Sequence, residues 1–217
     1  MTKILITYAS SSRFKKQEVE VLLESGTFPD SSGRERKIGD HFRFDFSGIR
    51  TDEPLEIDLI EMVKHKARSA YRSLLMPCIV EHAGLILGAN YEQGFPGGLT
   101  QPMWDALGAE EFLRRTASVG EPVVARAVIG YCDGMSVRTF VGETKGTVAD
   151  APRGDRDFYW DTIFCPDEIQ PGTYAEIAGD PERGIRVKMT ISQSYRAMRQ
   201  FLCMRFSQEE TGLFAAE

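Results

Sequence analysis

The chain has 217 residues, and 42% of them are hydrophobic, which is enough for one well-packed domain or for two lobes that share a core. The formal net charge of -6 argues against a broad basic surface, and so against a protein that binds nucleic acid. Four cysteines stand far apart without a Cys-x-x-Cys pair, which argues against a disulfide framework and against a zinc site.

The first quarter of the chain predicts a strand, a helix, a loop and a second strand. Residues 3–9 form an apolar run that predicts a buried strand and is too short for a signal peptide. The serines after it predict a turn that caps a helix ending at Gly26. Residues 27–37 are rich in Pro, Ser, Gly and charge and predict a loop, and the alternation over 41–46 predicts a half-exposed strand.

The middle of the chain predicts helices and short buried strands. Apolar residues between 55 and 75 recur at helical spacing and predict a long amphipathic helix. The elements expected after it are strands at 78–80 and 85–87 on either side of Glu81-His-Ala-Gly84, a loop at 94–98 and a helix over about 103–115. No run is long and apolar enough to span a membrane, so we expect a cytoplasmic protein without a membrane partner.

The last part of the chain predicts a hairpin and a closing helix. Residues 123–131 and 137–148 read as two strands that turn at Asp133-Gly134. The segments expected after the hairpin are a loop at 152–154, an aromatic run at 158–161 and a helix over roughly 192–206. This order predicts a mixed α/β fold, either one compact unit or two lobes around a cleft.

Several short motifs follow one another in order between about residue 3 and residue 202. They are Ser10-Ser-Ser12 with Lys15, Glu61 with Lys66-Ala67, Gly94-Phe-Pro-Gly97, Phe140-Val-Gly-Glu-Thr-Lys-Gly146 with Pro152-Arg-Gly154, and Phe158-Tyr-Trp-Asp-Thr-Ile-Phe164 with Pro166-Asp167 and Thr173-Tyr-Ala-Glu176. In this order they resemble the inosine triphosphate pyrophosphatase family, the Ham-type proteins that remove deaminated purine nucleotides from the precursor pool.

The resemblance implies an elongated α/β fold with a mixed sheet and two lobes around a nucleotide cleft. Residues 1–217 would form a single domain, with 27–50 as an inserted loop or hairpin longer than the family's and 207–217 as a flexible tail. The resemblance also implies a homodimer, a purine nucleoside triphosphate (ITP or dITP) as ligand, and Mg²⁺ bound with that nucleotide.

Cationic and hydroxyl side chains near the first turn suit a triphosphate, which carries about four negative charges. Lys15 follows a serine-rich turn at the start of a helix, where turn amides and an ammonium group attract phosphate; the alternative is an ordinary exposed lysine. Ser10 and Ser12 either donate to phosphate oxygens or cap the helix, and Ser12 stands where the family usually has asparagine. The resemblance places Lys66 in the same nucleotide site.

The resemblance assigns the purine base to Phe158, Trp160 and Asp161. Aromatic faces stack on bases, typically for about 1–3 kcal/mol per base, although such a run read alone is more often part of a core. Tyr159 replaces a family glycine and Thr162 replaces a proline, which would reshape this pocket.

The family's late Ser-His-Arg motif is lost. Lys188 and Ser192 can be placed, but Gln193 and Ser194 follow, and Arg196 comes too late to be the family's arginine. The Gln193 amide has the donor and acceptor that a six-oxo purine requires. Its N–H can donate to the oxo group, and its oxygen can accept a hydrogen bond from the N1–H of the purine. The alternative is an exposed glutamine that caps a helix.

The catalytic positions depart furthest from the family pattern. The family carries two adjacent acidic residues after its central strand, and this chain has Glu81 followed by His82. A neutral imidazole is a poor ligand for magnesium, although it could act as a base or be an ordinary polar residue at a strand end. Glu56 and Glu81 remain as weak candidate metal ligands.

Two functions follow from these departures. The first is a catalytically impaired sensor of ITP or dITP that acts with an effector subunit. By analogy with Ham-type components of bacterial anti-phage systems, that subunit would be a sirtuin-like NAD-consuming enzyme. The alternative is an active pyrophosphohydrolase that converts (d)ITP or (d)XTP to the monophosphate and pyrophosphate, with Glu81 and His82 as catalytic residues. A third interpretation is a structural subunit with a vestigial pocket.

Overall fold

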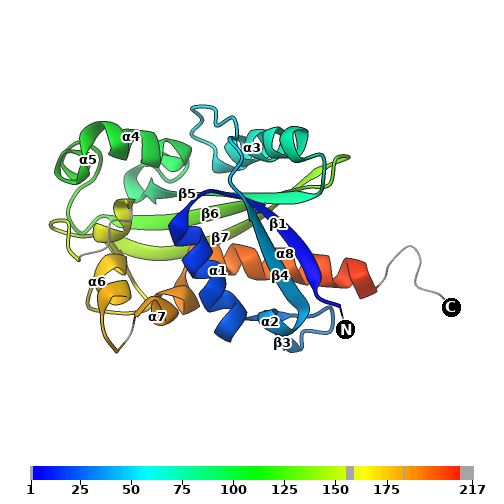
Figure 1. Ribbon diagram of the computed structural model, residues 1–217. Helices are drawn as coiled ribbons and strands as arrows, with labels where there is room; N and C mark the ends of the chain where they lie inside the picture. The colour runs from blue at the N-terminus through cyan, green and yellow to red at the C-terminus, as the bar shows by residue number, and fades with distance from the viewer. Residues whose placement is uncertain (1, 155–158, 183, 211–217) are drawn as a thin grey trace.

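The computed structural model describes residues 2–154, 159–182 and 184–210. Its centre is a six-stranded mixed sheet in the order β4-β1-β5-β6-β7-β8 (Figure 1). The strands are β1 (Ile4–Ala9), β4 (Phe42–Ser47), β5 (Cys78–Leu87), β6 (Pro122–Cys132), β7 (Val137–Val148) and β8 (Phe164–Pro166). β1 runs parallel to both of its neighbours, whereas β5 to β8 are antiparallel. The predicted mixed α/β class is confirmed.

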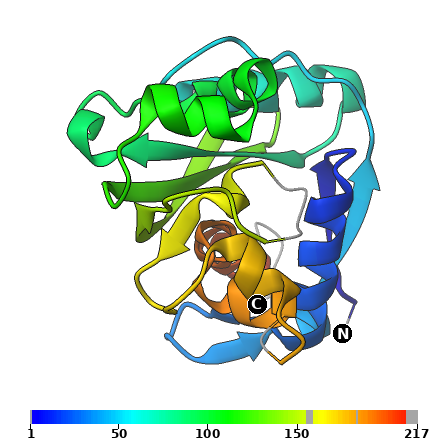
Figure 2. The same ribbon diagram turned by 90° about the vertical axis from the view of Figure 1, so that its left-hand side faces the viewer.

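Helices cover both faces of this sheet. They are α1 (Arg13–Ser25), α2 (Ile38–His41), α3 (Leu59–Leu74), α4 (Thr100–Leu107), α5 (Ala109–Thr116), α6 (Tyr174–Gly179), α7 (Gly184–Ile191) and α8 (Gln193–Glu210), with 3₁₀ turns η1 (Gly88–Asn90), η2 (Gly97–Leu99) and η3 (Tyr159–Thr162). In Figure 2, α3 to α5 form the layer above the long strands, and α1 and α6 to α8 lie below them. Among the described residues, no helix is long and apolar enough to cross a membrane.

Two glycines allow α3 and α8 to pack closely on opposite faces of the sheet. Gly130 of β6 lies under α3, where an added Cβ would stand 2.5 Å from a methyl group of Val63. Gly142 of β7 lies under the start of α8, where an added Cβ would stand 2.0 Å from the carbonyl oxygen of Gln193. Gly142 pairs with Ala127 of β6, an odd number of residues from Gly130, so the two glycines face opposite sides.

Residues 27–37 form a hairpin where the sequence predicted a loop. Strands β2 (Thr27–Pro29) and β3 (Glu35–Lys37) pair antiparallel. The Asp30 carboxylate holds the turn between them by accepting hydrogen bonds from Ser32, Arg34 and Arg36. Phe28 is fully buried, and its ring lies 5.3 Å from that of Phe206 in α8. The loop prediction was wrong because the segment has many polar turn residues and only one buried residue, Phe28, that ties it to the core.

Strand β5 is continuous, whereas the sequence predicted two short strands on either side of a polar break. All ten of its positions pair with β6, and Glu81 and His82 are buried in its middle. The alternative that His82 is a polar residue at a strand end is therefore also wrong. Two adjacent polar residues interrupt an apolar pattern, but they do not interrupt the backbone hydrogen bonds of the ladder.

The helix boundaries also differ from the predicted ones. The long helix begins at Leu59, because the Asp58 carboxylate caps it by accepting from the backbone N–H of Ile60 at 2.8 Å. The helix predicted over 103–115 is two helices, α4 and α5, which break at Gly108 with a φ of +75°. Helix α8 continues to residue 210, beyond its predicted end; the remainder of the predicted tail, 211–217, lies outside the described residues.

Candidate functional site

The sheet opens between β1 and β5. These parallel strands pair at a single position, Tyr8 with Ile79. β1 then ends at Ala9 and the chain turns into α1, while β5 continues to Leu87. The edge of β5 beyond Ile79 is therefore left without a neighbouring strand on that side.

A cavity of about 570 Å³ occupies this opening, a volume in the range of small-molecule sites. Its walls come from the end of β1, the turn after it, the first part of α1, the loop after β4, and parts of α3, β5, α4, η3 and α8. The lining residues are Ala9, Ser10, Ser11, Ser12, Arg13, Phe14, Lys15, Glu18, Ile49, Arg50, Thr51, Glu53, Lys66, Glu81, His82, Ala83, Gln101, Tyr159, Trp160, Gln193 and Ser194.

The start of α1 brings an ammonium group to the open edge of β5. Ser12 caps this helix, and its hydroxyl accepts from the backbone N–H of Lys15 at 3.4 Å. The hydroxyl of Ser10 accepts from the backbone N–H of Ser12 at 3.2 Å. The Lys15 ammonium donates to the main-chain carbonyl of Glu81 at 2.8 Å. Burial lowers the pKa of Lys15, and the charge of Glu81 opposes that shift.

Glu81 is a buried carboxylate with both oxygens engaged. Tyr8 donates to Oε2 at 2.6 Å, and Ser194 of α8 donates to Oε1 at 2.9 Å. The Lys15 ammonium lies 3.8 Å from the same Oε1. Burial and the neighbouring Glu81 raise the pKa of Tyr8 well above its usual value, so this phenol remains a hydrogen-bond donor.

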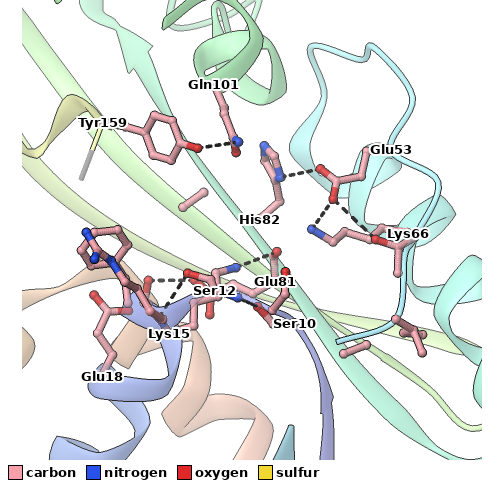
Figure 3. A pocket seen from close by; sticks show the side chains of 18 of the residues that line it. Ser10, Ser12, Lys15, Glu18, Glu53, Lys66, Glu81, His82, Gln101 and Tyr159 are labelled. Carbon is pink, nitrogen blue, oxygen red and sulfur yellow. Dashed lines mark hydrogen bonds and ion pairs between the residues drawn. The ribbon is translucent and has the colours of Figure 1, made fainter. Parts of the chain in front are cut away.

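His82 points to the opposite face of β5 and still reaches the cavity, because the cavity wraps around the free edge of the strand. Its Nδ1 lies 3.7 Å from Oε2 of Glu53, and Oε1 of Glu53 lies 2.8 Å from the Lys66 ammonium. Figure 3 shows Glu53 between His82 and Lys66. His82 is only 5% exposed, and its Nε2 has no hydrogen-bond partner among the described residues.

Burial and the charges of two nearby lysines keep the imidazole of His82 neutral. Burial, followed by the charges of Lys66 and Lys15, lowers the pKa of His82 to about 4. Burial alone would raise the pKa of Glu53, but the charge and hydrogen bond of Lys66 outweigh burial and lower it. At neutral pH this corner of the cavity therefore holds an ionised Glu53 and a neutral His82.

The aromatic end of the cavity is built by η3 and α4. Trp160 is buried and its ring lies 5.9 Å from that of Phe164, so it is both core and cavity wall. The Tyr159 hydroxyl accepts from the Gln101 side-chain amide at 2.9 Å, and Figure 3 shows the two side chains pointing toward each other. Phe158, the predicted stacking residue, lies outside the described residues.

A buried ion pair stands behind this end of the cavity. The Lys188 ammonium of α7 lies 2.6 Å from Oδ2 of Asp161, and both side chains are almost fully buried. Gln193, at the start of α8, lines the cavity, and its Oε1 accepts from the Tyr174 hydroxyl at 3.2 Å. At 3% exposure Gln193 is not the exposed capping residue that the sequence left open. Ser192 caps α8 instead, because its hydroxyl accepts from the backbone N–H of Tyr195.

The carboxylates around the cavity do not form a metal site. Each is already engaged by the protein itself, Glu81 by Tyr8 and Ser194, Glu53 by Lys66, and Glu18 by Lys188. Among the described residues, no group of three or more His, Cys, Asp and Glu could hold a metal ion. Magnesium prefers octahedral oxygen ligands, and the residue next to Glu81 is His82. This donor set does not fit a magnesium ion held by the protein.

Most of the predicted site residues meet in this cavity. Those that line it are Ser10, Ser12, Lys15, Lys66, Glu81, His82, Trp160 and Gln193. Asp161 and Lys188 are not among the lining residues. Glu56 does not line the cavity either, and its carboxylate accepts from the backbone N–H of Asp58 at 3.1 Å. The structure therefore does not bring Glu56 and Glu81 together.

Sequence reasoning missed Glu53, Gln101 and the contact made by Tyr159. Glu53 lies in the loop between β4 and α3, and Gln101 lies in the first turn of α4. Neither belongs to a motif with a characteristic spacing. The only signal was indirect, because Tyr159 was noted as a bulky residue in place of a family glycine.

Comparisons of the sequence with known proteins find relatives over most of the chain. Residues 6–204 match the sequence model of the Ham1 family. An inosine triphosphate pyrophosphatase of Scheffersomyces stipitis is 33% identical over 204 residues, which cover 91% of this chain and 97% of that protein. A dITP/XTP pyrophosphatase of Methanopyrus kandleri is 34% identical over 145 residues, which cover 66% of this chain and 72% of that protein.

Solved structures agree on the fold. A HAM1 protein from Coxiella burnetii matches with a TM-score of 0.64 at 20% identity, covering 94% of this chain and 99% of that chain. The Ham1 protein of Staphylococcus aureus matches with a TM-score of 0.61 at 19% identity, covering 95% and 100%. These structures confirm the predicted fold, and the match to the family model confirms the predicted resemblance.

Proposed function

The chain belongs to the Ham1 family, and from this premise we propose that it binds a deaminated purine nucleoside triphosphate, ITP or dITP, in the cavity between β1 and β5. The observation that carries the proposal is the pair of lysines that line one cavity of about 570 Å³. Lys15 stands at the capped start of α1 and Lys66 on α3, so two ammonium groups from different elements line one volume. Relatives named as ITP and dITP/XTP pyrophosphatases support the ligand class.

The base would lie toward Trp160 and Gln193, which both line the cavity. Trp160 offers an aromatic wall, and Tyr174 occupies the Gln193 carbonyl oxygen. The Gln193 amide nitrogen would then donate to the six-oxo group of hypoxanthine. Adenine carries an amino donor at this position, so a donating amide disfavours it. Selection for dITP over dATP follows from this single contact.

We infer that the protein still binds the nucleotide but no longer hydrolyses it, and that it serves as a sensor. The carboxylates of the cavity are bound to donors of the protein, and the residue beside Glu81 is a neutral histidine. The engaged carboxylates leave no free oxygen ligands for Mg²⁺, so no step is routed through a metal ion. A bound nucleotide bridging α1, α3 and η3 would change the surface offered to an effector subunit, which we propose to be a sirtuin-like NAD-consuming partner in anti-phage defence.

Hydrolysis to the monophosphate and pyrophosphate is the second candidate function, and one observation favours it. His82 is neutral and its side chain lines the cavity, its Nδ1 faces Glu53, and its buried Nε2 has no partner among the described residues. Such an imidazole can accept a proton from a water molecule that attacks phosphorus. If it does, His82→Gln should abolish pyrophosphate release, and undiminished release in that variant rules out this role.

The test of the proposed function is a calorimetric titration of dITP with magnesium into the purified protein, with dATP as the control. We expect a saturating heat for dITP and at least tenfold weaker binding of dATP, on the order of one lost hydrogen bond to a polar group. Equal affinities would contradict the role of Gln193. The absence of dITP binding would contradict the function itself.

A further inference from the structure

The cavity carries more cationic than anionic side chains. Among its described lining residues, the cationic ones are Arg13, Lys15, Arg50 and Lys66, and the anionic ones are Glu18, Glu53 and Glu81. His82 adds no negative charge, because an imidazole is either neutral or cationic. A triphosphate entering this volume therefore meets a wall that already favours anions. A cavity that relies on a bound divalent cation would instead need carboxylates free to coordinate it.

Lys66 is paired with Glu53, a counterion that can move away from it. Its side chain is 12% exposed, whereas that of its partner Glu53 is 40% exposed and belongs to the loop between β4 and α3. A carboxylate carries one charge, and a terminal phosphate carries more. A phosphate group that reaches Lys66 therefore competes with Glu53 electrostatically, and the exposed loop carboxylate can move into water.

His82 has a buried polar atom in the same cavity that calls for a partner. Its Nε2 is buried, has no hydrogen-bond partner among the described residues and belongs to a side chain that lines the cavity. An unpaired buried nitrogen is costly and is expected to find a partner in the functional state.

We propose that this cavity binds the triphosphate without a divalent metal ion, with Lys15 and Lys66 neutralising the phosphates and with Glu53 as the resident counterion that the phosphates displace from Lys66. The inference rests on the proposed function. It also follows from the donor set, in which every carboxylate around the cavity is held by a hydroxyl or ammonium donor of the protein.

The experiment compares dITP binding by calorimetry in excess EDTA and in excess magnesium. We expect the two dissociation constants to agree within about threefold, since a charge-neutralising metal is not required. Lys66→Met should weaken binding in EDTA by roughly tenfold or more, the usual effect of losing a hydrogen bond to a charged group. Lys64→Met is the matched control. Lys64 lies on the same helix, pairs with Glu61 and does not line the cavity, so this variant should bind like the wild type.

Two further variants test the charge balance directly. Glu53→Gln removes the competing counterion and should tighten binding in EDTA by a few-fold, on the order of 3. His82→Asp places a carboxylate beside Glu81 and should make binding magnesium-dependent, with weakened affinity in EDTA and recovery when magnesium is added. Each variant should keep the melting temperature of the wild type within a few degrees, so that loss of binding is not loss of folding.

The outcomes separate the two proposals. Binding of dITP that requires magnesium in the wild type overturns the metal-free site and leaves the proposed function intact. Binding that is equal in EDTA and magnesium but unchanged by Lys66→Met overturns the role of Lys66 and Glu53. The absence of binding under both conditions overturns the proposed function together with the inference.

Discussion

At the scale of single residues, Lys15 links the first helix to the open edge of β5. Its ammonium contacts the Glu81 carbonyl, and its side chain lines the cavity. We predict that Lys15→Met weakens dITP binding by roughly tenfold or more, because one charged contact to phosphate is lost. The matched control is Lys16→Met, since Lys16 is exposed and outside the cavity lining. Equal affinities of the two variants in calorimetry would contradict a phosphate role for Lys15.

His82 makes the stability of the protein depend on pH. Its pKa is lowered to about 4 in the folded chain from 6.5, so the unfolded chain binds the proton more readily. The free energy of unfolding should therefore fall as the pH drops below the unfolded pKa of 6.5 toward the folded pKa of about 4. We predict a loss of about 2 kcal/mol between about pH 7.5 and pH 5.

The pH prediction is checked by urea unfolding of the wild type and of His82→Gln at both pH values. The variant lacks the titrating group, so its stability should fall by less than that of the wild type. An identical fall in both proteins would assign the acid sensitivity to other groups.

The sequence identified the chemistry of Glu81 and His82 but not their placement. Neighbouring residues on a strand point to opposite faces, so the sequence left open whether His82 faces the cleft. Both line the cavity because β1 leaves β5 after a single paired position, which exposes the edge of the strand. Such a departure depends on the register of two distant segments, and no local pattern in the chain encodes it.

At the scale of the elements, Gly142 allows α8 to begin directly over β7. We predict that Gly142→Ala destabilises the fold by about 1–3 kcal/mol, because the new methyl group would stand 2.0 Å from the Gln193 carbonyl oxygen and force a shift. Gly179→Ala is the matched control, since an added Cβ there meets no atom within 4 Å. Thermal unfolding compares the two variants, and equal melting temperatures would contradict this close approach.

The ion pair of Lys188 with Asp161 fastens α7 to η3. We predict that Lys188→Met destabilises the fold by about 3–5 kcal/mol, because it leaves the Asp161 carboxylate buried without its cation. The control is Arg186→Met on the same helix, whose exposed pair with Glu24 should contribute less than about 1 kcal/mol. Chemical denaturation measures both changes. A loss for Lys188→Met no larger than that for Arg186→Met would show that the buried pair does not fasten η3.

Periodicity predicted the elements that bury one regular face. It found α1, the β6–β7 hairpin and α8 close to their observed bounds. It did not find α6, whose start depends on a capping box between Thr173 and Glu176 rather than on an apolar stripe. It also joined α4 to α5 across Gly108, since apolar spacing continues through the break.

At the scale of the whole molecule, the site combines segments that are far apart in the sequence. The order of motifs predicted the family and the mixed α/β class, and both are confirmed. The cavity walls come from many parts of the fold, among them the β4–α3 loop and α4, which carry no recognisable motif. Glu53 and Gln101 reach the cavity only through tertiary packing, which explains why sequence analysis found Lys15 and Lys66 but missed these two residues.

The central claim is that the protein retains a deaminated purine triphosphate intact. The most direct measurement incubates the protein with an equimolar amount of dITP and magnesium, separates bound from free nucleotide, and quantifies dITP, dIMP and pyrophosphate over time. The account predicts that dITP stays bound and unchanged while dATP is not retained. Release of dIMP and pyrophosphate over many turnovers, or failure to retain dITP, would contradict it.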